Sequence, residues 1–175
     1  MASIKMPDRL INFRVYNDKN DLLGIASVTL PEIESLTETL VGAGIAGEVE
    51  TPVLGHYGPM PCSFSWNSIT KEGMKLSRPG VHEIDLRGAQ QALDTASSKY
   101  VVVPIRFTLR LTPKNTSLGT FEPGATTDTE QEFETVYMKM YVNDEAVIEI
   151  DKFNYQAKFG EEDSLADVRK ALGLK

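Results

Sequence analysis

Apolar and polar residues alternate along most of this chain, which is the pattern of strands that bury one face. The clearest alternation covers residues 100–112. Its apolar positions are Val101, Val103, Ile105, Phe107, Leu109 and Leu111. A second strand is predicted at residues 62–68, with Cys62, Phe64 and Trp66 on one face. Pro104 cannot donate a hydrogen bond to a ladder, so we expect its part of the longer strand at an edge or a bulge.

A hairpin is predicted near the start of the chain. Residues 11–15 alternate, and the polar cluster at residues 17–21 supplies turn chemistry. Residues 22–30 are therefore expected to form the second arm. Pro31 interrupts this run, and residues 32–41 continue as another extended piece that bends at the proline.

The second half of the chain predicts a further hairpin. Residues 132–142 and 146–155 are rich in aromatic and β-branched side chains, and they flank the turn at residues 143–145. Residues 81–88 alternate as one more strand. Residues 112–131 are rich in Thr, Gly and Pro, so they are expected to form a long surface loop.

Two short helices are predicted. Residues 69–78 have room for one or two turns before Pro79 and Gly80 end them. At the C-terminus, Ser164 is in a position to cap a helix, with Asp167 three residues later and Gly173 after the last turn. The apolar stripe of this helix is Leu165, Val168 and Leu172.

The composition fits one soluble domain over residues 1–175. A chain of this size buries about 70% of its unfolded surface, so it needs neither disulfides nor metals. No apolar run approaches the roughly 20 residues that span a bilayer, so no membrane contact is expected. The net charge of −7 makes the chain a poor candidate for holding nucleic acid, whose phosphates require Lys and Arg.

The glycine-rich segment at residues 42–47 matches the G-x-G-x-x-G pattern of dinucleotide sites. Such a site needs a helix that begins at the loop, because the pyrophosphate rests on its N-terminus. Pro52, Pro59 and Pro61 exclude a helix of useful length there. The segment is therefore interpreted as a flexible glycine loop.

Catalytic and metal chemistry has little support in this sequence. His56 and His82 are the only histidines, and no metal-ligand spacing surrounds them. Cys62 is the single cysteine, and its place among apolar positions favours a small buried residue over a nucleophile. We therefore expect no cofactor, no metal and no enzymatic activity.

Four collinear stretches resemble the major tail tube protein family of bacteriophages with contractile tails, which includes the tube protein of P2-like phages. Residues 10–31 resemble its opening hairpin with a V-T-L-P ending, and residues 42–47 its glycine-rich turn. Residues 140–151 resemble its hairpin ending in E-I-D, and residues 160–174 its closing helix. Residues 70–99 depart from the family because they lack the longer helix expected there.

The resemblance implies a mainly β fold, a tail-tube-type β-sandwich or split barrel with a short C-terminal helix, and the residues themselves add one short mid-chain helix. It implies a structural subunit that assembles with itself into stacked hexameric rings, which form the hollow channel for genome ejection. Its expected partners are the tail sheath, baseplate, tail terminator and tape measure proteins. DNA passes through without specific binding. The expected location is the virion tail, with assembly in the host cytoplasm.

Two groups of residues carry the expected assembly function. Glycine loops suit a segment that changes conformation on docking. The glycines expected in contacts between subunits or rings are Gly42, Gly44 and Gly47. Acids facing the bore would repel DNA phosphates. The candidates for this role are Glu32, Glu34 and Glu38, although a solvated face is the default interpretation of such a run of acids.

Three alternative functions stay open at this stage. The chain could be the tube subunit of an R-type bacteriocin or another contractile injection system, which passes no genome. It could be a monomeric adhesion or carbohydrate-binding β-sandwich. Such a protein needs exposed aromatic side chains, whereas Trp66 lies on the apolar face of its predicted strand. A nucleotide-dependent enzyme is the third alternative.

Overall fold

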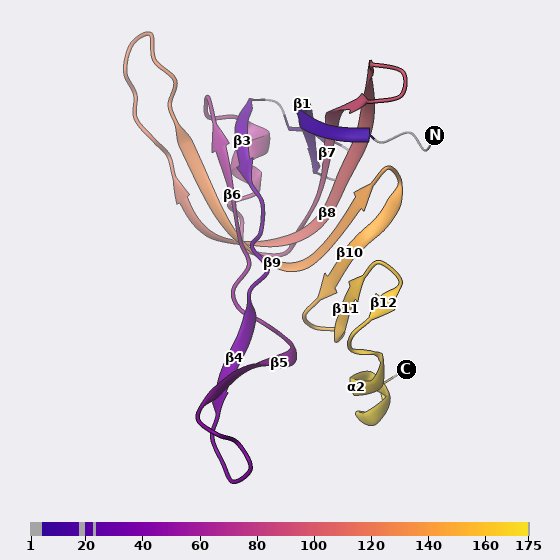
Figure 1. Cartoon of the computed structure of the whole chain (residues 1–175). Helices are drawn as coiled ribbons and strands as arrows, with labels where there is room; N and C mark the ends of the chain where they lie inside the picture. The colour runs from indigo at the N-terminus through magenta and orange to yellow at the C-terminus, as the bar shows by residue number, and fades with distance from the viewer. Residues whose placement is uncertain (1–4, 18–19, 23, 175) are drawn as a thin grey trace.

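The computed structural model describes residues 5–17, 20–22 and 24–174, and strands dominate it (Figure 1). Among these residues, ten strands form one antiparallel sheet and two form a separate hairpin. The strands are β1 Lys5–Asn17, β2 Asn20–Asp21, β3 Ile25–Thr29, β4 Ser35–Leu40, β5 Val49–Tyr57, β6 Pro61–Trp66, β7 His82–Asp94, β8 Lys99–Ser117, β9 Thr129–Val142, β10 Glu145–Asp151, β11 Gln156–Phe159 and β12 Glu162–Asp163. The helices are α1 Lys71–Lys75 and α2 Ala166–Ala171. The predicted mainly β fold with two short helices is confirmed.

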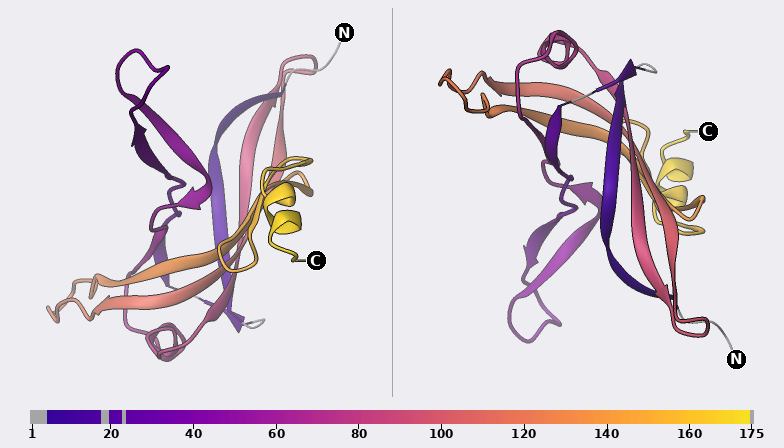
Figure 2. Two further views of the ribbon diagram at one scale, coloured as in Figure 1. Left: turned by 90° about the horizontal axis from the view of Figure 1, so that it is seen from below. Right: turned by 90° about the horizontal axis from the view of Figure 1, so that it is seen from above.

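The sheet is an open, strongly curved barrel. Its strand order is β12-β11-β10-β9-β8-β7-β1-β2, and β6 pairs with the first half of β9 and carries β3 on its other side. The sheet bends so far that its part formed by β3 and β6 faces its part formed by β1, β7 and β8 (Figures 1 and 2). The core fills the space inside this bend.

Alternation of side chains builds this core. In β6, Cys62, Phe64 and Trp66 are buried, and the rings of Phe64 and Phe133 lie 5.1 Å apart. Burying side chains of this size stabilises the fold by about 1.5–3 kcal/mol each. The fully buried Gln131 accepts a hydrogen bond from Trp66 Nε1 at 3.0 Å and donates one to the Gly73 carbonyl at 3.1 Å. This amide therefore ties α1 to the core.

The longest predicted strand and the second predicted hairpin are confirmed. β8 buries Leu109 and Leu111 as the alternation requires. Its ladder with β9 begins at Ile105, so Pro104 lies in the part of β8 that pairs with β7 alone, as expected for an edge. β9 and β10 form the hairpin, and Asn143 and Asp144 turn with φ of 52° and 64°.

The first predicted hairpin is wrong in its pairing. Residues 25–29 form β3, which pairs with β6 instead of β1. β1 pairs mainly with β7, and its hairpin partner β2 contributes two residues, with the turn residues 18–19 outside the described part of the chain. The turn after β1 was predictable from the neighbouring residues. The partner of β3 was not, because it depends on which strands close over the core.

The predicted loop at residues 112–131 is shorter in the structure. β8 continues to Ser117, and β9 begins at Thr129, so the loop proper covers residues 118–128. The residues on either side of this loop pair with each other as the ends of β8 and β9, and those of β9 also pair with β6. These polar residues are therefore strand because of their partners. The interruption at Pro31 is confirmed, because β3 ends at Thr29 and β4 begins at Ser35.

Both predicted helices are present, but the cap of the second one differs. Thr70 caps α1 by accepting a hydrogen bond from the Gly73 amide at 3.1 Å. The predicted Ser164 cap is wrong, because Leu165 occupies the cap position of α2 without a side-chain cap bond. The carboxylate of Asp163 accepts the Leu165 amide at 3.2 Å instead, and the Leu165 side chain is buried.

Candidate assembly surfaces

The β4–β5 hairpin (Ser35–Tyr57) projects away from the sheet as a separate two-stranded arm (Figure 1). An isolated two-stranded hairpin is at best marginally stable in water. Six of its large apolar side chains are nevertheless exposed to solvent. They are Leu36, Leu40, Val41, Val49, Val53 and Leu54. An arm of this composition is expected to be completed by another surface.

The two faces of this hairpin differ in polarity. Leu40 lies opposite Val49, and alternation places Leu36 on the same side. On the other side Thr39 lies opposite Glu50, whose carboxylate accepts a hydrogen bond from the Thr37 hydroxyl. One face is therefore mainly apolar and one is polar, which is the arrangement of a sheet that packs on one side only.

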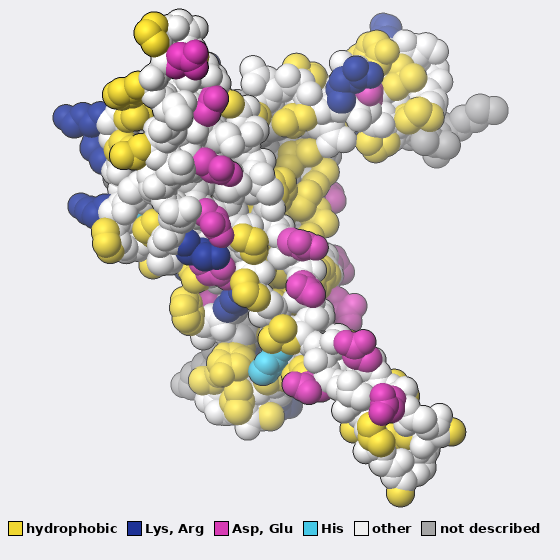
Figure 3. Space-filling view, turned by 90° about the vertical axis from the view of Figure 1, so that its left-hand side faces the viewer, with side chains coloured by type: hydrophobic (Ala, Val, Ile, Leu, Met, Phe, Trp, Pro, Cys, Tyr) yellow, Lys and Arg dark blue, Asp and Glu magenta, His cyan; other side chains and the backbone are white. Residues whose placement is uncertain are grey.

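The predicted bore acids lie at the start of this arm, and all three are exposed. Glu32 and Glu34 occupy the link before β4, whereas Glu38 lies within β4 on the apolar side, between Leu36 and Leu40. Acidic side chains mark the path from the sheet into the arm, at the lower right of Figure 3. The structure thus separates the three acids into two environments.

The loop glycines form the tip of the arm. The Ile45 amide donates to the Gly42 carbonyl at 3.2 Å, and Gly44 and Gly47 have φ of 93° and 114°. No atom would lie within 4 Å of a side chain added at Gly42, Gly44 or Gly47. The loop leads into β5 and not into a helix, so the dinucleotide interpretation is excluded.

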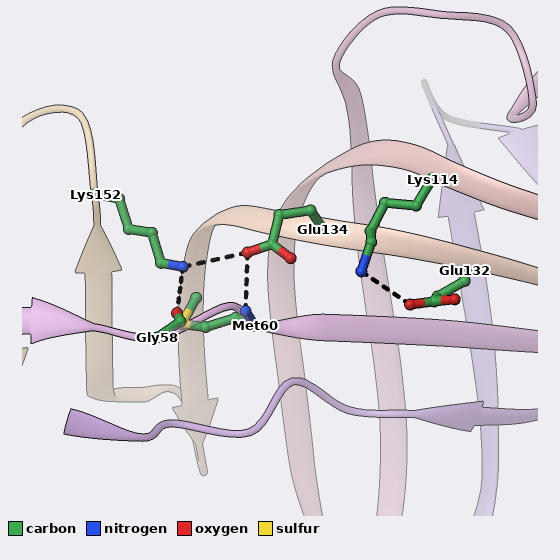
Figure 4. A network of polar contacts seen from close by, with 6 residues as sticks. All are labelled: Gly58, Met60, Lys114, Glu132, Glu134 and Lys152. Atoms are coloured by element: carbon green, nitrogen blue, oxygen red, sulfur yellow. Dashed lines mark hydrogen bonds and ion pairs between the residues drawn. The ribbon is translucent and has the colours of Figure 1, made fainter. Parts of the chain in front are cut away.

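A group of polar residues, the root network, holds the base of the arm (Figure 4). The Lys152 ammonium donates to the Gly58 carbonyl at 2.7 Å and lies 3.3 Å from the Glu134 carboxylate. The same carboxylate accepts the Met60 amide at 2.9 Å. The Gly58 amide donates to the Glu34 carbonyl at 2.9 Å, so both ends of the arm are fixed.

Sequence patterns gave no signal for the root network, because Glu134 and Met60 are 74 positions apart. The C-terminal helix adds a second contact at the same place. A side chain at Gly55, where φ is 70°, would come within 2.2 Å of the buried Leu165. The base of the arm is therefore held by Glu134 of β9, by Lys152 just after β10, and by Leu165 at the N-cap of α2.

On the outer face of the sheet, arginine side chains lie over tyrosine rings. The guanidinium of Arg106 lies 4.1 Å from the centre of the Tyr141 ring, and Arg110 lies 4.7 Å from that of Tyr137. Burial and the neighbouring Glu149 carboxylate raise the pKa of Tyr137 to about 12. These cations are engaged by rings and acids on the same face, so the face is not an open basic patch for nucleic acid.

The open edge of β1 is the third surface. Its ladder with β2 involves Tyr16 and Asn17 alone among the described residues, although β1 begins at Lys5. Within the described ranges, most of the outer backbone of this long strand therefore has no strand beside it. An open edge of this length is a template for pairing with another chain.

Reactive chemistry is weak in the part of the chain that the structure describes. The Cys62 side chain is buried, and burial raises the pKa of its thiol to about 12. Such a thiol does not act as a nucleophile near neutral pH. Within the described ranges, no group of His, Cys, Asp and Glu is arranged to hold a metal ion, and no helix is long and apolar enough to cross a membrane.

Comparison with known proteins decides the family. The model of the family described as phage tail tube protein FII matches residues 7–173. The chain belongs to this family. The resemblance noted from the sequence is thereby confirmed, and a phage tail tube protein is a structural component of the virion tail and not an enzyme. No curated protein sequence matches the chain significantly.

Two solved structures share the tail tube fold at 12% sequence identity. Both belong to an extracellular contractile injection system, PVC, in its extended state. The first, a sheath/tube terminator structure, has a TM-score of 0.51 and covers 75% of this chain and 94% of its own. The second, a sheath–tube complex, has a TM-score of 0.50 and covers 74% and 88%. These likenesses support the curved β fold.

Proposed function

We propose that this tail tube protein assembles into hexameric rings that stack into a hollow tube, through which the phage genome is ejected. The observation that carries the proposal is the open outer edge of β1 in the described part of the chain, together with an arm that exposes the large apolar side chains of Leu40, Val41 and Val49. A head-to-tail contact that closes on itself pairs such edges and forms a ring. Strands from all copies then build one continuous wall around the bore.

The partners follow from membership in the family. We propose that the tube lies inside the tail sheath, starts at the baseplate and ends at the tail terminator, with the tape measure protein in its bore. Sheath–tube and terminator assemblies are what the two similar structures contain. DNA is proposed to pass without specific binding, which agrees with the net charge of −7 and with the engaged cations of the sheet face.

The glycine tip is proposed to dock on the neighbouring ring. Gly42→Val is the best test, because a Cβ atom added at Gly42 meets no atom within 4 Å and Gly42 lacks the positive φ of Gly44 and Gly47. We expect a folded monomer that polymerises poorly. Gly44→Val adds backbone strain of about 1–2 kcal/mol and serves as the harsher variant. Tubes of normal length from Gly42→Val, seen by negative-stain electron microscopy, would reject this role of the tip.

Negative charge in the bore is proposed to come from Glu32 and Glu34. Glu38 lies on the apolar side of the arm, so we separate it from them. Replacing Glu32 and Glu34 with Lys should slow DNA release, and more so at low salt, where attraction to phosphate is less screened. Glu38→Lys is the matched variant. Identical release kinetics of the double variant and the wild type across salt concentrations would exclude the bore role.

The decisive experiment is negative-stain electron microscopy of the purified protein at high concentration. Six-membered rings or hollow rods are the expected result. A monomer under all conditions, in sizing chromatography as well as in images, would contradict the proposal. The second candidate is the tube of a bacteriocin or other contractile injection particle that carries no genome, which the fold likeness favours. Nuclease-protected DNA in purified particles would exclude that candidate.

A further inference from the structure

Three arginines stand side by side across the sheet, on strands that are neighbours in Figure 1. Arg14 of β1 lies directly opposite Arg87 of β7, and Arg87 lies directly opposite Arg106 of β8. All three residues are exposed to solvent, whereas their neighbours Val15 and Leu86 are buried in the core. This arginine row (Arg14, Arg87 and Arg106) therefore lies on the outer face of the sheet, away from the core.

Such a row costs stability, because like charges directly opposite each other on neighbouring strands repel. In the part of the chain that the structure describes, Asp85 is the only acid in an ion pair with Arg87 or Arg106. Its carboxylate oxygens lie 2.7 Å from Arg87 Nη2 and 4.0 Å from Arg106 Nε. One negative charge therefore serves two guanidiniums, and these two arginines retain an excess of positive charge.

Aromatic rings orient the guanidiniums of the row. The guanidinium of Arg87 lies 5.2 Å from the centre of the Tyr16 ring, and that of Arg106 lies 4.1 Å from that of Tyr141. Stacking uses the flat face of a guanidinium, whereas its N–H donors point outward in its plane and match the shape of a carboxylate. The side chains of Arg87 and Arg106 are still 61% and 44% exposed. The rings therefore hold donors that solvent, and a ligand, can reach.

A hollow of about 810 Å³ adjoins the row. Arg87 and Arg106 line it together with Tyr16. Glu83 and Asp85 also line it, so cationic and acidic groups are interleaved on this surface. A continuous line of phosphates is repelled by these acids, whereas separate carboxylates can be placed over the arginines alone. The surface therefore favours an acidic protein segment over nucleic acid.

The spacing of the row indicates the shape of that segment. Neighbouring strands lie about 4.8 Å apart, so the three arginines span about 10 Å. Side chains at positions i, i+4 and i+7 of a helix share one face and also span about 10 Å, at a rise of about 1.5 Å per residue. Side chains on one face of an extended segment repeat about every 6.7 Å, which fits the row less well. An acidic helix is therefore the better match.

We propose that the arginine row binds carboxylates on one face of an acidic helix of a partner protein. Each carboxylate accepts hydrogen bonds from the N–H groups of a guanidinium, and the added negative charge offsets the repulsion along the row. The inference goes beyond the proposed function and does not rest on it, because the row is a surface of the single chain.

Two model peptides and a duplex test the ligand. The first peptide is an alanine-rich helix of about 20 residues with Glu at positions i, i+4 and i+7, and the second carries Gln at the same positions. We expect the Glu peptide to bind the purified protein, in fluorescence anisotropy, about tenfold more tightly than the Gln peptide, and less tightly as salt is raised. Absence of binding by the Glu peptide, or tighter binding of a DNA duplex, overturns the proposal.

The sheet offers a matched pair of variants, Arg106→Gln and Arg110→Gln. Both arginines belong to β8, both lie over a tyrosine ring, and their side chains are 44% and 47% exposed. Arg106 lies 4.0 Å from the Asp85 carboxylate, and Arg110 lies 3.9 Å from that of Glu83. The neighbours directly opposite Arg110 are Glu83 and Tyr137, so this arginine is outside the row.

Arg106→Gln should weaken binding of the Glu peptide about tenfold, and Arg110→Gln by less than about twofold. Arg106→Gln should also lower Tm less than Arg110→Gln does, because it removes a repulsive neighbour of Arg87. Thermal unfolding followed by circular dichroism measures Tm and establishes that both variants are folded. Equal weakening by the two variants would indicate a general attraction to basic groups and overturn the row. A larger loss of Tm in Arg106→Gln with unchanged peptide binding would indicate a structural role alone and overturn it as well.

Discussion

Two Lys–Glu pairs share β9 as the strand of their glutamates but differ in burial and in their hydrogen bonds to the hairpin base, so they provide a controlled test of what holds the β4–β5 hairpin. In the root network, Lys152 and Glu134 have side chains that are 24% and 26% exposed. Lys114 and Glu132 are 44% and 41% exposed, with their charged atoms 2.9 Å apart. Figure 4 shows both pairs side by side. We compare Lys152→Met with Lys114→Met, which removes the same charge and keeps a similar length.

The expected magnitude follows from the contacts. Lys152 donates to the Gly58 carbonyl and pairs with Glu134, and a hydrogen bond that involves a charged group contributes about 1.5–3 kcal/mol. We use roughly 1.5–2 kcal/mol, because the side chain is partly exposed. An exposed pair such as Lys114–Glu132 contributes about 0–1 kcal/mol. For a domain of this size, 1 kcal/mol shifts Tm by about 2–4 °C.

Lys152→Met should therefore lower Tm by about 3–8 °C, and Lys114→Met should have a smaller effect. Thermal unfolding of the monomer, followed by circular dichroism, measures both. Hydrogen exchange should also be faster at the amides of Gly58 and Met60 in Lys152→Met alone, because the root of the hairpin loosens. An equal or larger loss of Tm in Lys114→Met would refute the reasoning.

Three further outcomes are expected. The Cys62 thiol should stay unmodified by maleimide at pH 8 until urea unfolds the chain. Because burial raises the pKa of this thiol, its contribution to the free energy of unfolding is lost as the pH rises above about 9 toward 12. Gly55→Val should lower Tm and expose the C-terminus to proteolysis, since its Cβ atom would lie 2.2 Å from Leu165 Cδ2. Gly55→Asn relieves only the strain of positive φ and should also lower Tm, because its Cβ atom meets the same collision. The Arg169 guanidinium lowers the pKa of Asp163, so the stability difference between wild type and Arg169→Met should shrink as the pH falls through the folded pKa of Asp163. The part due to the hydrogen bond from Arg169 to the Tyr155 carbonyl should remain.

Much of the local structure could be predicted from the sequence. Alternation located β6, β8, β9 and β10 because the side-chain period of a strand is a local property. The turn at Asn143 and Asp144 was predictable because both residue types tolerate positive φ. Collinear motifs were sufficient to indicate the tail tube family, which the family match confirms.

Strand partners and the polar contacts at the root of the hairpin could not be predicted. β3 pairs with β6 and not with β1, since closure of the curved sheet over Phe64 and Trp66 decided the pairing. Nothing local to Glu134 and Lys152 indicates that they hold Gly58, because those contacts join segments far apart in the chain.

The sequence by itself determined the strand periodicity, the acidic balance and the glycine tip of the arm. Only the tertiary structure decided that the β4–β5 hairpin stands apart from the sheet, and that Leu40 and Val49 stay exposed to solvent there. The physical reason is that periodicity is set by neighbouring residues, whereas an unpartnered surface is defined only after every other segment has been placed.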